Sequence, residues 1–595
     1  MGLRQKILKK AFDIQYVKIY YYIIQNKGGI FLKTLLKGGT VVNVFTDELE
    51  KANVLIEDER IIGVGDYSEA DADCVHDVSG KYICPGFIDG HIHIESTMML
   101  PAEFARAAVL HGTSAVVSDP HEIANVCGSE GIEFMLEASE GLPLDMYIMV
   151  PSCVPATSFD ESGAELSAAD IEPFYRRSRV LGLAEMMNYV GVVSGDKGVM
   201  DKINSAKAKG KVINGHAPLL SGRDLDKYVA AGIRDDHECS SADEAKERIR
   251  KGQRVMIRNG TAARNLSGLI DLFDDPWNRR CLLVTDDKHA ADLIANGHID
   301  DIIRLAVKAG KSAVTGIRMA TLQAAEAFGL KNEGAVAPGY SANLAVLDDL
   351  DSVSVCDVYH LGKKVVSAGK LEEFENPKIS AALKERVLHS FNLSSLCEKD
   401  FHIAASGIRK CRVIDLVKHQ LITEEALLDI DFSNNNGVDT EKDILKLAVI
   451  ERHRNTGHIG LGFIRGIGLK EGAIAASVSH DSHNLIVIGT GEADMAFAAN
   501  RVRGLGGGMV VVRKGSVVAE MPLPYAGIMT DSPAIDVAKQ NEAVRESVHT
   551  LGVPADIEPF MTMAFVSLPV IPKIKMTTLG LFSSESWSIV PLFAD

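Results

Sequence analysis

The sequence predicts an α/β protein: a TIM (β/α)8 barrel with a split small β-sandwich domain and an additional C-terminal α/β domain. Eight strand-like runs, most of them followed by a helix-compatible segment, occupy about 250 residues in the middle of the chain, which is the size of such a barrel. Short β-branched runs flank this region on both sides. After Lys370 the pattern changes again. An open doubly wound sheet is the alternative for the central region.

At 595 residues the chain is several times the usual domain size, and we expect four parts. Residues 1–33 predict an N-terminal extension, which is basic and aromatic but lacks the apolar region and cleavage site of a signal peptide. Residues 34–83 together with 333–370 predict the small β-sandwich. Residues 84–332 predict the barrel, and residues 371–595 predict the C-terminal domain.

Each barrel strand is predicted where an apolar or β-branched run ends in a polar loop. In a barrel these ends lie together at the carboxyl face, which carries the functional residues. The predicted barrel strands cover residues 86–93, 114–119, 146–151, 180–185, 211–216, 233–237, 255–258 and 282–286. In the C-terminal domain a helical stretch at 379–388 precedes strand-like runs at 411–416, 447–451, 474–478, 485–489 and 509–512.

The composition and net charge indicate which kinds of binding partner the protein favours. The hydrophobic content of 46% and charged content of 24% are typical of a folded globular protein rather than a disordered or collagen-like chain. The 63 Lys and Arg against 80 Asp and Glu give a net charge of −17, which disfavours nucleic acid and acidic membrane surfaces. A small neutral or cationic ligand fits this charge better.

The nine cysteines include no CxxC pair, so the sequence supports neither a disulfide framework nor a thiolate zinc site, and a cytoplasmic location is expected. The most apolar stretch, residues 16–24, carries Lys18 and is far shorter than the ~20 residues of a membrane-spanning helix. We therefore expect no membrane anchor.

The motif PGFIDGHIH, residues 85–93, ends an apolar strand with two histidines, His91 and His93. Because side chains alternate along a strand, both imidazoles lie on the same face. In a barrel this face is the interior, so both rings would converge on one point at the catalytic end, as in a metal site. A lone HxH is a weak signal, but its place at a strand end behind PGFIDG makes it strong.

Further metal ligands should lie at other strand ends. Four residues close predicted strands: Glu185, His216, His237 and Asp286. For each residue alone, a capping or solvated polar role is an equal alternative, but together they favour a shared site. Four histidines and two carboxylates suit a pair of divalent ions such as Zn, Mn or Fe(II), which would lower the pKa of a bridging water. The chemistry indicated is hydrolysis.

These features resemble the amidohydrolase superfamily of metal-dependent hydrolases over roughly residues 34–370. Glu185, in AEMMN, stands where many members carry a carbamylated lysine, and in this it resembles the adenine deaminase branch. The branch is also indicated by the motifs HIESTM (93–98), SDPHEIANV (118–126), NGHAP (214–218), DHE (236–238) and TDD (285–287), and by GHIG (457–460), SHDSHN (479–484) and LGGG (505–508) in the C-terminal part. Two departures are Ala342-Asn343, where the family often has Ala-Asp, and the loosely similar segment 583–595.

The resemblance implies hydrolytic deamination of adenine to hypoxanthine and ammonia, in purine salvage, at a binuclear Mn²⁺ or Fe²⁺ centre, with Zn²⁺ less expected. In that arrangement the metal ligands are His91, His93 and Asp286 for one ion, His216 and His237 for the other, and Glu185 as the bridge. A bridging hydroxide would attack C6 of the purine. Asp286 is the expected proton acceptor and Glu185 the second catalytic residue.

Two further clusters remain open. Asp119, His121 and Glu122 follow the second strand and would bind the purine, move protons or hold a further ion, with a structural loop role as the alternative. His480 and His483 are either site contributors or, as is commoner for such pairs, structural residues. Asn188, Arg258 and His289 also lie near strand ends, but ordinary loop packing explains them equally well.

Two other functions stay in view. One is a different amidohydrolase, such as a cyclic amidase or a deacetylase, and the other is a non-catalytic scaffold. The complete set of ligand residues argues against the scaffold. For an adenine-specific member we expect a small-molecule substrate and a homo-oligomer, either a dimer or a tetramer.

Overall fold

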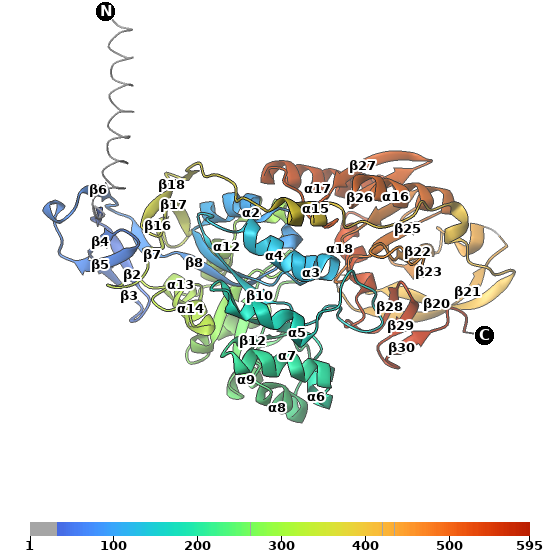
Figure 1. The fold of residues 1–595 in the computed structure, drawn as a ribbon, viewed down its shortest axis with the longest axis horizontal. Helices are drawn as coiled ribbons and strands as arrows, with labels where there is room; N and C mark the ends of the chain where they lie inside the picture. Colours follow the sequence, from blue (N-terminus) through green and yellow to red (C-terminus); the bar gives the residue numbers. More distant parts are fainter. Residues whose placement is uncertain (1–31, 262, 419, 434, 595) are drawn as a thin grey trace, which may run out of the picture.

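The computed structural model describes residues 32–261, 263–418, 420–433 and 435–594. The predicted N-terminal extension therefore lies almost entirely outside the described residues. The described molecule is elongated, with a small β domain at one end, a barrel in the middle and the C-terminal domain at the other end (Figure 1). The first described strand, β1, begins at Lys33 and belongs to the small β domain.

Eight parallel strands form the barrel, which confirms the predicted fold class. One arc has the order β12-β11-β10-β9-β8 and a second has β13-β14-β15. The arcs are joined on one side by a hydrogen bond from Arg234 N to Ile213 O and on the other by a bridge between Ile92 and Asp286. The strands are β8 (Phe87–Ile92), β9 (Thr113–Ser118), β10 (Asp145–Val150), β11 (Val180–Met186), β12 (Val212–Gly215), β13 (Asp235–Asp236), β14 (Arg254–Arg258) and β15 (Cys281–Val284).

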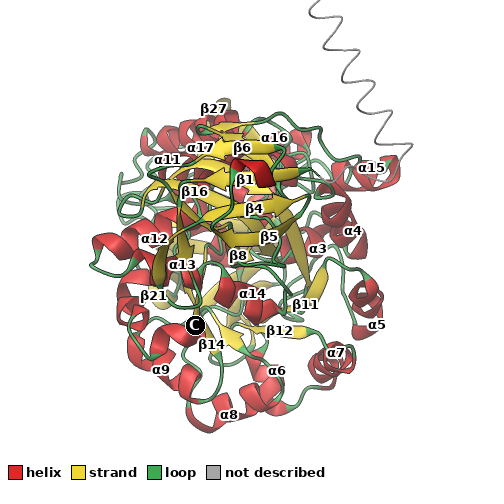
Figure 2. Ribbon diagram, turned by 90° about the vertical axis from the view of Figure 1, so that its left-hand side faces the viewer, coloured by secondary structure: helices red, strands yellow, loops and turns green. Residues whose placement is uncertain are grey.

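Helices surround these strands, as Figure 2 shows. They are α2 (Pro101–Ala108), α3 (His121–Cys127), α4 (Ser129–Ala138), α5 (Ala168–Ile171), α6 (Tyr189–Ser194), α7 (Lys197–Ala208), α8 (Gly222–Ala230), α9 (Ala242–Arg250), α10 (Leu266–Leu269), α11 (Ala290–Asn296), α12 (Ile299–Lys308), α13 (Ala313–Met319) and α14 (Leu322–Phe328). Apolar side chains from the strands, including Val117, Met149 and Leu282, pack with Phe328 of α14 into one buried cluster. The barrel interior is therefore a packed core, and only its polar carboxyl end remains for chemistry.

Two sheets form the small β domain, with the orders β5-β4-β1-β6 and β19-β18-β17-β16-β7-β2-β3. Their facing side chains, among them Leu36, Ile56, Ile83 and Val346, share one buried cluster, as in a sandwich. Strands from before and after the barrel meet where β7 pairs with both β2 and β16. The strands are β1 (Lys33–Lys37), β2 (Thr40–Asn43), β3 (Glu48–Lys51), β4 (Asn53–Glu57), β5 (Arg60–Gly65), β6 (Cys74–Asp77), β7 (Tyr82–Pro85), β16 (Leu344–Asp349), β17 (Ser354–His360), β18 (Lys363–Ser367) and β19 (Lys370–Leu371).

The C-terminal domain is built on an eight-stranded sheet of order β21-β20-β23-β22-β25-β24-β26-β27. A three-stranded sheet, β28-β29-β30, accompanies it. The strands are β20 (Ile408–Leu416), β21 (Thr423–Asp431), β22 (Leu445–Ile450), β23 (Ile459–Arg465), β24 (Ala473–Ala476), β25 (Leu485–Gly489), β26 (Gly508–Arg513), β27 (Ser516–Pro522), β28 (Ile574–Thr577), β29 (Gly580–Ser583) and β30 (Ser588–Val590). The helices are α15 (Ala381–Leu388), α16 (Glu492–Leu505), α17 (Ala534–His549) and α18 (Pro559–Ala564).

Side chains of the central strands alternate between the two faces of this sheet, and both faces are buried. On β22, Ala448 and Ile450 pack in the cluster that contains α16, whereas Leu447 and Val449 belong to the large core shared with α17 and the barrel. Strands covered on both faces have apolar side chains in both directions, which explains the apolar run LAVI at the end of β22. The C-terminal domain is thus joined to the barrel through a common core.

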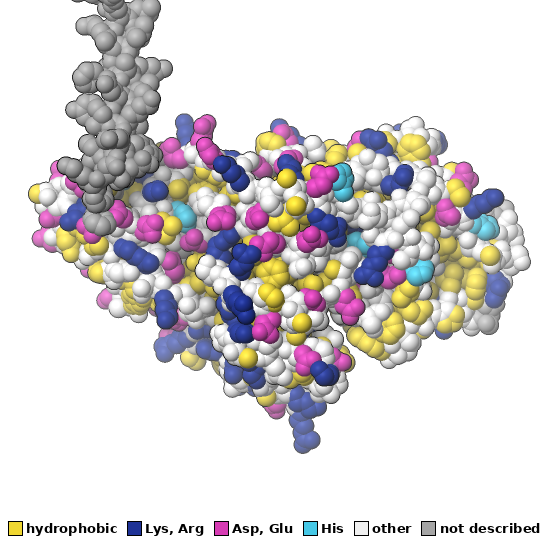
Figure 3. All heavy atoms as spheres, viewed as in Figure 1, with side chains coloured by type: hydrophobic (Ala, Val, Ile, Leu, Met, Phe, Trp, Pro, Cys, Tyr) yellow, Lys and Arg dark blue, Asp and Glu magenta, His cyan; other side chains and the backbone are white. Residues whose placement is uncertain are grey.

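On the face in Figure 3, acidic and basic side chains are interspersed rather than gathered by sign. None of the helices in the described ranges is long and apolar enough to cross a membrane.

Candidate metal centre and substrate cavity

The two histidines of PGFIDGHIH lie at the carboxyl end of β8, where they are almost completely buried. Their ring centroids are 4.8 Å apart. Gly90 directly precedes His91 in β8. It has no room for a side chain, since a Cβ there would lie 2.5 Å from Leu282 Cδ1. The close packing of this strand therefore fixes where both imidazoles emerge.

Glu185, at the end of β11, lies at the centre of the cluster. Its Oε2 is 2.7 Å from His216 Nδ1 and 3.2 Å from His237 Nε2. Its Oε1 is 3.4 Å from His93 Nε2. Burial alone would raise the pKa of Glu185, but the nearby His216 and His237 hold it well below its usual range. An ionised carboxylate between two sets of imidazoles has the placement of a bridging ligand.

Asp286 follows β15 and faces the β8 histidines. Its Oδ1 is 3.2 Å from His93 Nε2 and 3.5 Å from His91 Nε2. Its Oδ2 accepts a hydrogen bond from Arg258 Nη1 at 2.5 Å. Burial opposes ionisation, but the Arg258 guanidinium holds the pKa of Asp286 well below its usual range. Asp286 is therefore a carboxylate with one oxygen fixed by arginine and the other directed at the histidines.

The donor set fits a divalent metal site. Among the described residues, five groups of possible ligand atoms lie within 4.8 Å of one another. They are His91, His237 and Asp286; Glu185, His216 and His237; His93, Asp119, His121 and Glu185; His93, Asp286 and Asp287; and Glu122, His480 and His483. His93 Nδ1 lies 3.0 Å from the Asp119 backbone oxygen, which leaves Nε2 free to bind a metal, as is usual for metal-ligating histidines. None of these groups contains both His91 and His93, so they differ from the expected division, in which these two histidines share one ion.

His121 and Glu122, at the start of α3, line the same cavity as the imidazole cluster. His121 Nδ1 is 3.1 Å from Asp119 Oδ2 and 3.4 Å from Glu185 Oε1. Asp119 lies behind His121 rather than among the residues that line the cavity. Its backbone and side chain thus orient His93 and His121, whereas His121 and Glu122 face the cavity directly.

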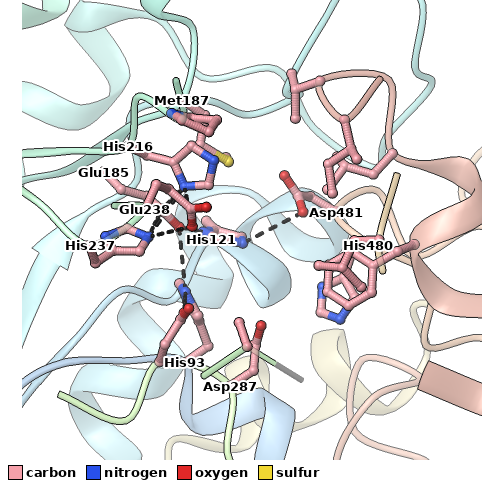
Figure 4. A pocket seen from close by; sticks show the side chains of 18 of the residues that line it. His93, His121, Glu185, Met187, His216, His237, Glu238, Asp287, His480 and Asp481 are labelled. Atoms are coloured by element: carbon pink, nitrogen blue, oxygen red, sulfur yellow. Dashed lines mark hydrogen bonds and ion pairs between the residues drawn. The ribbon is translucent and has the colours of Figure 1, made fainter. Parts of the chain in front are cut away.

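The C-terminal domain reaches this site through the connection between β24 and β25. His480 Nδ1 is 3.3 Å from Glu122 Oε1, and His483 Nε2 is 3.6 Å from Glu122 Oε2. His480 and Asp481 line the cavity, across from His216 and His237 (Figure 4). The histidine pair that the sequence left open therefore lies at the site, and both rings hold Glu122.

The cavity has a volume of about 420 Å³. One wall is the polar cluster, and much of the rest is apolar: Met187, Tyr189, Pro218, Leu219, Leu220, Leu421, Ile422, Phe565, Leu568, Val570, Ile571 and Pro572. A mostly apolar pocket with a few convergent polar groups is typical of a small-molecule site.

Several residues of the site were not selected from the sequence. Arg258 joins Asp286 to Glu238, whose Oε1 lies 3.3 Å from His237 Nε2. Asp287 lines the cavity and accepts a hydrogen bond from Ser96. Glu238, Arg258 and Asp287 each lie at or just after a strand end, which is the signal that could have found them. Asp481 has no such signal, since it comes from another domain.

Comparison with known proteins agrees with this architecture. Residues 82–374 match the family described as Amidohydrolase family, which is metal-dependent, and residues 420–588 match the Adenine deaminase C-terminal domain. The barrel region is thus that of an amidohydrolase.

The full chain narrows this class. It is 44% identical to Adenine deaminase 2 of Carboxydothermus hydrogenoformans, over 94% of this chain and 96% of the relative. It is 42% identical to Adenine deaminase of Desulfatibacillum aliphaticivorans (95% and 98%) and 41% identical to Adenine deaminase of Bacillus velezensis (94% and 96%). The chain belongs to the adenine deaminase family.

Proposed function

We propose that this protein hydrolyses adenine to hypoxanthine and ammonia in the described cavity. Membership of the adenine deaminase family over nearly the whole chain supports the substrate. The observation that carries the chemistry is the position of Glu185, whose two oxygens face His93 on one side and His216 and His237 on the other. That arrangement suits two metal ions around one carboxylate.

We propose Mn²⁺ or Fe²⁺ as the native metal, since nitrogen and carboxylate ligands without thiolates suit these ions. The residues that would hold the pair are His91, His93, Glu185, His216, His237 and Asp286. When bound, such a pair lowers the pKa of a coordinated water towards neutrality and so supplies a nucleophile at pH 7.

The chain's own groups would orient the base and move the proton. Asp286 Oδ1 is free of Arg258 and would take a proton from the attacking water and pass it to the departing amine. Glu185 would fix the position of His93 relative to His216 and His237. His121 and Glu122 would contact the purine, and Asp119 would orient His93 and His121 from behind.

Ammonia release from adenine by Mn²⁺-loaded protein is the direct test. We expect turnover that is lost on chelation and restored by adding back Mn²⁺ or Fe²⁺, with two ions bound per chain by metal analysis. Protein that holds two ions and releases no ammonia from adenine would contradict the proposal. Ring opening of hydantoin or dihydropyrimidine would then favour a cyclic amidase, and protein that binds no transition metal would favour a scaffold.

We further propose a cytoplasmic homo-oligomer, either a dimer or a tetramer. Eight of the cysteines, Cys74, Cys84, Cys127, Cys153, Cys239, Cys281, Cys356 and Cys397, are free thiols, as expected in a reducing compartment. Light scattering on the metal-loaded protein measures the oligomeric state, and a monomeric mass would contradict this proposal.

A further inference from the structure

Asp481 is a buried carboxyl group that the C-terminal domain places in the cavity. It is 3% exposed and points towards the imidazole cluster (Figure 4). Its Oδ1 is 3.9 Å from His121 Nε2, beyond hydrogen-bond distance, and its Oδ2 has no hydrogen-bond partner among the residues described. A buried polar atom without a hydrogen-bond partner costs free energy. An unpartnered carboxyl oxygen at a cavity wall is therefore suited to accept a hydrogen bond from a ligand.

The neighbouring carboxylates are already engaged by the protein. Asp287 Oδ1 accepts a hydrogen bond from Ser96 Oγ at 2.5 Å, and Glu122 Oε1 faces the same hydroxyl at 3.1 Å. Glu122 also faces His480 and His483. Asp481 lines the same cavity, and its Oδ2, which has no hydrogen-bond partner among the described residues, keeps its acceptor capacity for a substrate.

The segment that carries Asp481 is fixed from both sides. Arg452 Nε donates to His483 O at 2.6 Å, and His453 Nε2 lies 2.8 Å from Ser482 O. Asn484 Nδ2 donates to Glu161 O, in the barrel, at 2.7 Å. A carboxyl group held in this way can discriminate between ligands, because it cannot turn aside to satisfy itself.

We propose that Asp481 accepts a hydrogen bond from the ring N–H of the imidazole half of adenine and so selects the free base over purines substituted at that nitrogen, such as nucleosides. This inference rests on the proposed function. It requires a pose in which C6 faces Glu185 and the imidazole half faces Asp481. These two carboxyl groups lie on opposite sides of the His121 ring, whose Nδ1 is 3.4 Å from Glu185 Oε1 and whose Nε2 is 3.9 Å from Asp481 Oδ1, so a base that reaches both would present a different edge to each.

The chemistry of that edge gives the selectivity. A free purine base carries an N–H donor there, and a carboxylate offers only acceptors. A base substituted at the nitrogen brings a bulky group and no donor, which leaves the buried carboxyl unpaired. Sites built on buried hydrogen-bonding groups reject analogues that lack the partner by large factors.

The test compares kcat/KM for adenine and for 9-methyladenine, which has no ring N–H, in the metal-loaded wild type, Asp481→Ala and Asp481→Asn. We expect Asp481→Ala to lower kcat/KM for adenine by about 10- to 100-fold, mostly through KM, because one charge-assisted hydrogen bond is lost. The preference for adenine should fall by a similar factor. Asp481→Asn preserves the shape of the site, and its amide oxygen still accepts a hydrogen bond. In this variant kcat/KM for adenine and the preference for adenine should both fall less than in Asp481→Ala.

The ratio of kcat/KM for the two substrates, measured on one preparation, does not depend on the fraction of enzyme that is folded and metal-loaded. Glu333→Gln is the matched control, since Glu333 is a half-buried carboxyl that does not line the cavity and has its hydrogen-bond partner, Asn343, elsewhere in the molecule. Its adenine preference should equal that of the wild type. An unchanged preference in both Asp481 variants overturns the inference, and wild type inactive on adenine overturns the proposed function instead.

Discussion

At the scale of single residues, the two oxygens of Asp286 have different surroundings. Arg258 holds Oδ2, while Oδ1 faces His93 and His91. This division lets one side chain keep a fixed orientation and still exchange a proton at its free oxygen. An asparagine would retain the shape and an oxygen ligand but could not accept the proton.

We therefore expect Asp286→Asn to lose at least ~10³ in turnover of adenine, since proton transfer and electrostatic stabilisation are each worth orders of magnitude in rate. The measurement is kcat at saturating adenine, with metal content determined on the same sample. Near wild-type turnover with two ions still bound would remove Asp286 from the proton transfer.

At the scale of elements, the shortest barrel strand depends on one arginine. β13 spans only Asp235–Asp236, less than the predicted 233–237. Arg248 of α9, fully buried, donates to Asp236 Oδ2 at 3.0 Å and to Ala217 O at 2.6 Å. It thereby ties together the loops that follow β12 and β13, which carry His216 and His237.

Arg248→Met should lower the free energy of unfolding by about 3–5 kcal/mol, because it leaves the buried Asp236 carboxylate unpaired. Thermal and urea unfolding of the metal-loaded protein measure the change. Arg223→Met, an exposed arginine on α8, is the matched control and should change stability by no more than about 0.5 kcal/mol. Equal stability of the two variants would contradict a structural role for the Arg248–Asp236 pair.

The elements also show what periodicity could and could not predict. All eight barrel strands were located from the sequence, because each is an apolar run that ends in a polar loop. In the C-terminal domain β20, β22, β24, β25 and β26 were located, but β21, β23, β27, β28, β29 and β30 were missed. β21, TEEALLDID, is an edge strand with several exposed residues, so it lacks the apolar signal of the central strands.

At the scale of the whole molecule, the barrel and the C-terminal domain meet at a charged contact. His480 lies 3.3 Å from Glu122, and both are buried. Burial alone would lower the pKa of His480, but the Glu122 carboxylate raises it to about 9. Since the unfolded value is about 6.5, the contact stabilises the folded state fully below pH 6.5, and this contribution is lost as pH rises through 9.

His480→Gln should therefore lower the melting temperature clearly at pH 6 and much less at pH 10, relative to wild type at each pH. The shift in pKa corresponds to a contribution on the order of 3 kcal/mol at the lower pH. His389→Gln, at an exposed histidine directly after α15, is the control and should show no such pH dependence. A difference between His480→Gln and wild type that stays constant with pH would contradict the ion pair.

By itself, the sequence determined the architecture and the proposed ligand residues, because strand periodicity and strand-end position are local properties of the chain. The sequence did not show which histidines each carboxylate oxygen of Glu185 and Asp286 faces, or that Arg258 fixes Asp286. It also did not show that His480 and Asp481 reach the cavity. The contacts of Arg258 with Asp286 and of Glu185 with His216 join neighbouring strands of the barrel. His480 and Asp481, by contrast, lie hundreds of positions beyond the barrel residues they meet, and only packing between the two domains brings them to the cavity. The tertiary structure alone thus decided that one oxygen of the buried Asp481 has no hydrogen-bond partner among the described residues.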